Sequence, residues 1–145
     1  MIDFRKILIA FNVKADEVAL DMQIDIAFAG RTITGDIYEP QPDVSYLNCN
    51  LLPNDAERRG LKNGESEVMR GAIYQIDVYA TKEGKANPDL EALQKANEVR
   101  DNFSQGLVLT ADGQDCKVTQ CNSPFTRPSD THKAYTVDVI FECIA

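Results

Sequence analysis

The sequence predicts an α+β fold in which a mostly antiparallel sheet carries two helices packed on one face. Two segments repeat apolar residues at spacings of three and four, as amphipathic helices do, and several others alternate apolar with polar residues, as strands do. The alternating segments come in adjacent runs joined by short turns, which favours antiparallel pairing. With 145 residues, 43% of them apolar, the chain suits one domain spanning residues 1–145.

The first helix is predicted to begin after Asp3, which is a suitable N-cap. Its buried stripe should consist of Phe4, Ile7, Leu8, Phe11, Ala15, Val18, Ala19 and Met22. Residues 24–28 then alternate apolar with small or acidic residues, which predicts a strand. Residues 32–43 contain Gly35, Pro40 and Pro42 and should form an extended loop.

The next strand should cover residues 44–52 and end at Pro53, which cannot donate to a ladder. Leu47, Cys49 and Leu51 share one face of it. Val44 and Tyr46 fall on the opposite parity, so we expect either a bulge near Tyr46 or a strand buried on both faces. We interpret Cys49 as a core residue.

A charged, glycine-containing loop is predicted from residue 54 to 67. Residues 69–81 that follow alternate most clearly of all, with Gln75, Asp77, Tyr79 and Thr81 on the polar face. We expect Asp77 to be a solvated or interface residue. The apolar face should consist of Ala72, Tyr74, Ile76, Val78 and Ala80.

The second helix should begin at Asn87, an N-cap followed by proline and an acidic residue, and should end near Gly106. Its predicted buried stripe is Leu90, Leu93, Ala96, Val99 and Phe103. A hairpin should turn at residues 111–113, and a second loop should cover residues 122–132. The closing strand should bury Tyr135, Val137, Val139, Phe141 and Cys143.

Neither the cysteines nor the histidine predicts chemistry. Cys49, Cys116, Cys121 and Cys143 could pair in three ways, but all lie in strand-like runs, and we expect all four to be reduced and to act as small apolar residues. The CxxC spacing of zinc sites is absent, so we expect no metal. His132 lies in a polar stretch, where we expect an exposed side chain.

Charge and motifs exclude several function classes. The net charge of −8 disfavours adhesion to nucleic acid or to an anionic membrane. No apolar run approaches the roughly 18 residues that span a bilayer, and the N-terminus does not resemble a signal peptide, so we expect synthesis in a cytoplasm. The sequence lacks GxSxG, HExxH, GxxxxGK[ST] and GxGxxG. We therefore expect a structural or binding protein without cofactors.

An ordered set of segments resembles the small tail terminator proteins of tailed bacteriophages. The segments are SYLNCNLLPND, a polar loop with glycine, RGAIYQIDVYA, a helix closed by NFSQGLVLT, and a final YTVDVIFECIA, together covering residues 44–145. The helix at the N-terminus followed by IDIAF also resembles the opening of this family. Residues 29–43, the EGKANPD turn and the SPFTRPSDTH loop depart from its pattern.

The resemblance implies a structural virion protein without enzymatic activity. It would form a ring, expected to be six-fold, that caps the head-proximal end of the tail tube, stops tube growth and joins the tail to the head connector. Its partners would be copies of itself, the tail tube protein and a connector or neck protein. DNA would pass through the lumen without specific binding, and assembly would occur in the cytoplasm of the bacterial host.

The long loop and the polar face of the strand at 69–81 are the predicted contact surfaces of such a ring. The side chains that we expect at subunit or tube contacts are Asp55, Glu57, Arg58, Arg59, Lys62, Asp77, Tyr79 and Arg127. One alternative is another neck, head–tail completion or minor tail protein. A further alternative, from a different class, is a small cytoplasmic enzyme or ligand-binding domain, which would need a pocket with convergent polar groups.

Overall fold

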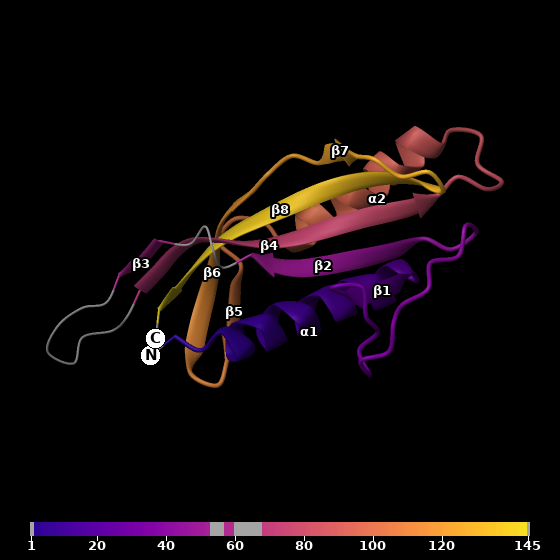
Figure 1. Cartoon of the computed structure of the whole chain (residues 1–145). Coiled ribbons are helices and arrows are strands. Elements are labelled where there is room, and N and C mark those ends of the chain that lie inside the picture. Colours follow the sequence, from indigo (N-terminus) through magenta and orange to yellow (C-terminus); the bar gives the residue numbers. More distant parts are fainter. Residues whose placement is uncertain (1, 53–56, 60–67, 145) are drawn as a thin grey trace, which may run out of the picture.

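The structure is a computed structural model that describes residues 2–52, 57–59 and 68–144 (Figure 1). Along this part of the chain the elements are α1 (Phe4–Met22), β1 (Asp25–Phe28), β2 (Tyr46–Leu52), β3 (Glu57–Arg59), β4 (Val68–Thr81), α2 (Pro88–Asn102), β5 (Val108–Ala111), β6 (Gln114–Cys121), β7 (Phe125–Arg127) and β8 (His132–Ile144).

The strands form one curved sheet in the order β1-β2-β4-β8-β6-β5. The long strands β4 and β8 pair antiparallel at its centre, from Ala72 opposite Phe141 to Thr81 opposite His132. The short strands lie off this path, β3 on β4 and β7 on β8. The fold is therefore α+β with a mostly antiparallel sheet, as predicted. The exception is the parallel pair β1 and β2, whose connection is the long segment between Phe28 and Tyr46.

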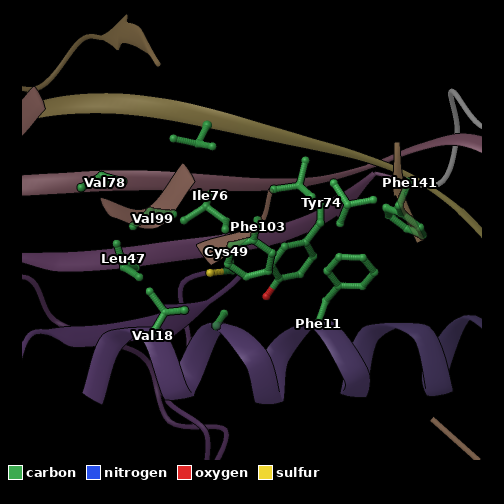
Figure 2. Close-up of a cluster of buried hydrophobic side chains, with 14 of the residues drawn as sticks. Phe11, Val18, Leu47, Cys49, Tyr74, Ile76, Val78, Val99, Phe103 and Phe141 are labelled. Carbon is green, nitrogen blue, oxygen red and sulfur yellow. The ribbon is translucent and has the colours of Figure 1, made fainter. Parts of the chain in front are cut away.

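Both α1 and α2 pack on the same face of the sheet, which we call the inner face. Phe11 of α1 lies at the centre of this layer, with its ring centroid 4.9 Å from that of Tyr74 and 4.4 Å from that of Phe141 (Figure 2). Phe103, which follows α2, stacks on Phe11 at 6.5 Å. These four rings are fully buried. They join both helices to the central strands, which confirms the predicted helix layer.

The helix boundaries follow the predicted capping residues. Asp3 Oδ1 accepts a hydrogen bond from Arg5 N at 2.9 Å, and Asn87 Oδ1 accepts one from Leu90 N at 3.3 Å. The central residues of both predicted stripes are buried, but some residues at the edges are not. Leu8 is 37% exposed and Leu90 is 50% exposed, so both predictions of burial were wrong. Leu90 lies in the first turn of α2, whose buried residues begin at Ala92.

Two short strands lie in segments predicted to be loops. β3 falls inside the predicted loop at 54–67 and pairs with the start of β4, from Glu57 opposite Arg70 to Arg59 opposite Val68. β7 falls inside the predicted loop at 122–132 and pairs with Thr136, Tyr135 and Ala134 of β8. Three-residue strands are too short for an alternating pattern to distinguish them from loops.

The irregular positions of the sheet have local causes. The pairing of β4 with β8 shifts register between Met69 and Ala72, and Gly71 there has φ +77°, which is typical of a β-bulge. Asp112 and Gly113 both have positive φ in the turn between β5 and β6, as a type I′ hairpin requires. Tyr46 is 8% exposed and its pairing with β4 is regular, so β2 begins as a strand buried on both faces.

Candidate functional site

The outer face of the sheet, opposite the helices, carries the polar side chains of β4 that were expected at a contact surface. Asp77 lies there but is only 1% exposed. Its Oδ1 accepts a hydrogen bond from Thr136 Oγ1 at 2.7 Å and lies 3.4 Å from Arg127 Nη1. Asp77 is therefore not solvated, because the β7 residue Arg127 lies over it, while its role as an interface residue stays a prediction.

Burial dominates the electrostatics of this carboxyl. Desolvation raises the pKa of Asp77, and the hydrogen bond from Thr136 and the charge of Arg127 oppose that effect only in part. The nearby charge of Asp138 raises the pKa further. Asp77 and Arg127 thus form a partly buried pair that holds β7 against the sheet, and loss of Arg127 would leave the buried carboxylate of Asp77 without a counter-charge.

An aromatic cluster of Tyr38, Tyr46, Tyr79 and His132 covers the outer face next to this pair. Tyr46 stacks on Tyr79 with ring centroids 4.6 Å apart, and Tyr38 contacts Tyr46 at 5.0 Å. The Tyr38 hydroxyl donates to Asp25 Oδ2 at 3.1 Å. The cluster therefore fastens the segment between β1 and β2 to the sheet.

His132 belongs to this cluster and is 2% exposed, so the expectation of an exposed histidine was wrong. Its Nε2 lies 2.8 Å from the carbonyl oxygen of Val44, and its Nδ1 lies 2.8 Å from Thr131 Oγ1. A carbonyl can only accept, so Nε2 carries the proton, and Nδ1 can then accept from the Thr131 hydroxyl. The Nε2 bond ties the loop before β2 to β8, and the Nδ1 bond to the neighbouring Thr131 holds the ring in the orientation that this requires.

Of the other predicted contact residues, Tyr79 and Arg127 lie on the outer face, where Tyr79 is half-buried and the side chain of Arg127 is 40% exposed. Their role in contacts with other chains remains a prediction. Glu57, Arg58 and Arg59 form β3, at the end of the sheet where the chain termini lie (Figure 1). Asp55 and Lys62 lie outside the described residues, as does most of the predicted loop at 54–67.

One cysteine prediction is wrong, because Cys116 and Cys143 form a disulfide. They lie directly opposite each other on β6 and β8, with Cα atoms 4.3 Å apart. The residues were recognised as strand positions, but their register could not be read from spacing alone.

Cys49 and Cys121 are free thiols. Burial raises the pKa of Cys49 to about 12 and that of Cys121 to about 11. Both thiols are therefore overwhelmingly protonated at neutral pH, which is unfavourable for a nucleophile. Cys49 is a core residue, as predicted.

A groove of about 480 Å³ runs between α1 and the hairpin of β5 and β6. Ile9 and Val13 lie along it and are 58% and 55% exposed, and Leu109 and Ala111 line its other wall. The sequence reasoning missed this surface. The spacing of four between Ile9 and Val13, outside the predicted buried stripe, was the available signal for a second apolar face on α1.

Within residues 2–52, 57–59 and 68–144, no three His, Cys, Asp or Glu side chains gather as metal ligands. Neither α1 nor α2 is both long and apolar enough to cross a membrane. The buried polar side chains Asp77, His132 and Thr136 are hydrogen-bonded within the sheet or to the segments that cover it. A polar pocket of about 480 Å³ lies between the end of α2 and β6 and includes Arg100, Asp101 and Gln120 in its lining.

Comparison with known proteins identifies the family. A family model described as "Phage tail terminator protein" matches residues 6–140. The chain belongs to the phage tail terminator family. The match extends from α1 to β8, so it includes the helix at the N-terminus and the segment at 29–43 that departs from the expected pattern.

The fold of this chain is also found in a solved structure. It is 17% identical in sequence, with a TM-score of 0.61, and the alignment covers 100% of this chain and 97% of that one. No curated protein sequence matches the chain. Membership in the tail terminator family supports a structural role in a phage tail.

Proposed function

We propose that this protein is the subunit of a six-fold ring that caps the head-proximal end of the phage tail tube. The ring stops tube growth and joins the tail to the head connector. The observation that carries the proposal is the family match over residues 6–140. In this role the protein has no turnover and needs no cofactor, and its partners are copies of itself, the tail tube protein and a connector or neck protein.

The charge of the chain supports this role. A ring around the tail lumen must let DNA pass without binding it. A chain with a net charge of −8 would repel the DNA phosphates, whereas a basic chain would bind them. Ring subunits also need two different surfaces that meet head to tail, because a heterologous interface closes into a ring. Assembly would occur in the host cytoplasm, and the finished ring would remain in the virion.

The proposal can be tested with purified components. Added to growing tail tubes, the protein should bind one end and stop further addition of tube subunits, and electron microscopy should show closed rings at that end. Tubes that continue to lengthen at both ends in the presence of saturating protein would contradict the capping role.

The segment around β3 is the proposed contact with the neighbouring subunit or the tube. Reversing the charge of Arg58 and Arg59 to glutamate should weaken assembly or alter tail length, because a mixed-charge surface depends on complementary partners. The matched control reverses Lys82, which is exposed and follows the end of β4, whereas β3 pairs with the start of β4. Unchanged assembly and tail length in the R58E/R59E variant would count against this contact.

A further inference from the structure

We propose that the groove between α1 and the β5–β6 hairpin of one subunit receives the turn at residues 31–37 of the next subunit in the ring. This inference rests on the proposed ring and assigns the two surfaces that meet. We call the first surface the α1 groove and the second the isoleucine turn, after Ile33 and Ile37.

The isoleucine turn exposes two large apolar side chains to solvent. Ile33 and Ile37 are 74% and 70% exposed, the highest values among the large apolar side chains that the structure describes. Two such side chains within one turn expose apolar surface whose hydration is unfavourable in free energy, and a partner that covers them would remove this cost.

The turn is also rigid, which favours a docking role. Thr32 N donates to Asp36 O at 2.8 Å, Gly35 N donates to Thr32 O at 2.9 Å, and Tyr38 N donates to Gly30 O at 2.9 Å. Gly35 has φ +94°, a conformation that glycine adopts without strain. Because these bonds already fix the two isoleucines, little conformational entropy would be lost on binding.

The α1 groove offers a matching apolar surface. Ile9 and Val13 are more than half exposed along one wall, and Leu109 and Ala111 lie on the other. One or two branched aliphatic side chains would fit a groove of about 480 Å³ and would remove both sets of apolar groups from water.

The charges around the two surfaces are complementary. The charged side chains that line the groove are Lys6, Lys14, Glu17 and Asp112. Lys6 pairs with Asp112 at 3.0 Å, while Lys14 and Glu17 make no ion pair with any described residue, so the groove offers one cation and one carboxylate to a partner. Asp36 lies between the two isoleucines in sequence and accepts a hydrogen bond from Thr34, with no cation paired to it among the described residues. Docking would bring Asp36 to Lys14, which favours another copy of this chain as the occupant.

The placement of the two surfaces suits a ring. The isoleucine turn follows β1, and the groove borders β5, and these strands are the opposite ends of the sheet order β1-β2-β4-β8-β6-β5. One subunit can therefore offer the turn on one side and the groove on the other, which is the head-to-tail arrangement that a closed ring requires. The two isoleucines in the α1 groove would form the centre of the interface. Further contacts around them must supply the rest of the area that a stable interface buries.

Cysteine cross-linking tests the contact directly. A chain carrying V13C and one carrying I33C are mixed under assembly conditions and oxidised. The expected product is a covalent dimer in the mixture but not with either variant alone, because like surfaces do not meet in a heterologous interface. The double variant V13C/I33C should give a ladder up to the full ring. Wild type and L90C, whose site is an exposed leucine on α2, serve as controls for the native thiols.

Substitutions give a second readout. I33D or V13D should raise the concentration at the midpoint of ring assembly by about tenfold or more, because a charge would be buried against apolar groups. L90D should leave it unchanged. K14E should weaken assembly, and D36K in the same chain should restore it.

The outcomes separate this inference from the proposed function. If the wild type forms rings, I33D assembles equally well and V13C does not cross-link to I33C, the contact is overturned but the proposed ring is not. Rings that form normally with I33D but no longer bind tail tubes would show that the isoleucine turn contacts the tube protein, which also overturns the proposal. A wild-type chain that stays monomeric at every concentration, alone and with tubes, overturns both.

Discussion

The two faces of the central sheet are buried by different means. The inner face is covered by α1 and α2 with apolar side chains around Phe11. The outer face is covered instead by the side chain of Arg127 and by the segment between β1 and β2. The outer face holds the buried polar residues Asp77 and His132, each of which is hydrogen-bonded. The inner face stabilises the fold through apolar area removed from water, whereas the stability of the outer face depends on specific hydrogen-bond partners.

The largest effect is expected on the inner face. Phe11→Ala should lower the free energy of unfolding by about 3–5 kcal/mol, since it removes a fully buried ring that contacts Tyr74, Phe103 and Phe141. Urea denaturation measures this change. Leu90→Ala, at an exposed site, should change it by less than about 0.5 kcal/mol and serves as the control. Similar values for the two variants would contradict the assignment of the core.

The disulfide gives the next largest effect. Cys116 and Cys143 both belong to the inner-face core and are 27 residues apart in sequence. Reduction should lower the free energy of unfolding by about 3 kcal/mol, because it frees the unfolded chain from a closed loop. Alkylation without reductant, followed by mass spectrometry, should label Cys49 and Cys121 only, and only after unfolding for Cys49. Four labelled cysteines in unreduced, unfolded protein would exclude the disulfide.

On the outer face, His132→Ala should lower the free energy of unfolding by about 2 kcal/mol, because the half-buried carbonyl of Val44 loses its partner and the buried imidazole leaves a cavity. Val44 precedes β2, so amide hydrogen exchange should increase at the start of that strand. A variant as stable as the wild type would show that the aromatic cluster contributes little to holding the segment between β1 and β2.

The smallest effect is a change in pH dependence. The raised pKa of Asp77 means that the folded chain binds this proton more tightly than the unfolded chain does. The resulting stability is fully present below the ordinary pKa of an aspartate and is lost as pH rises through the raised value. Asp77→Asn should therefore remove the decline in stability that begins at the ordinary pKa of 3.8 and continues through the raised pKa, while the amide oxygen can still accept from Thr136. An unchanged pH profile of unfolding would contradict the assignment.

Periodicity predicted the inner face well, because burial of one face requires apolar residues at a regular spacing along the sequence. The alternation in β4 and β8 separated the two faces, and Asp3 and Asn87 marked the helix starts. The outer face could not be predicted in the same way. Asp77 and His132 are polar in sequence and buried in the fold because of distant partners, Arg127 and Val44, that no local pattern reveals.

The candidate contact surfaces show the same limit. The mixed charge of residues 54–67 predicts a contact surface, whereas the exposed isoleucines at 33 and 37 lie in a segment that the sequence predicts only as a loop. Their exposure becomes visible once the hydrogen bonds of the turn fix their direction. The pairing of Cys116 with Cys143 likewise depends on strand register, which spacing does not determine.

The most direct test of the proposed role is electron microscopy of phage particles made without this protein. The ring-capping role predicts headless tails of abnormal, extended length, because tube growth has no stop. Tails of normal length beside unattached, filled heads would contradict it, and would favour a completion protein that acts after the tail has been terminated.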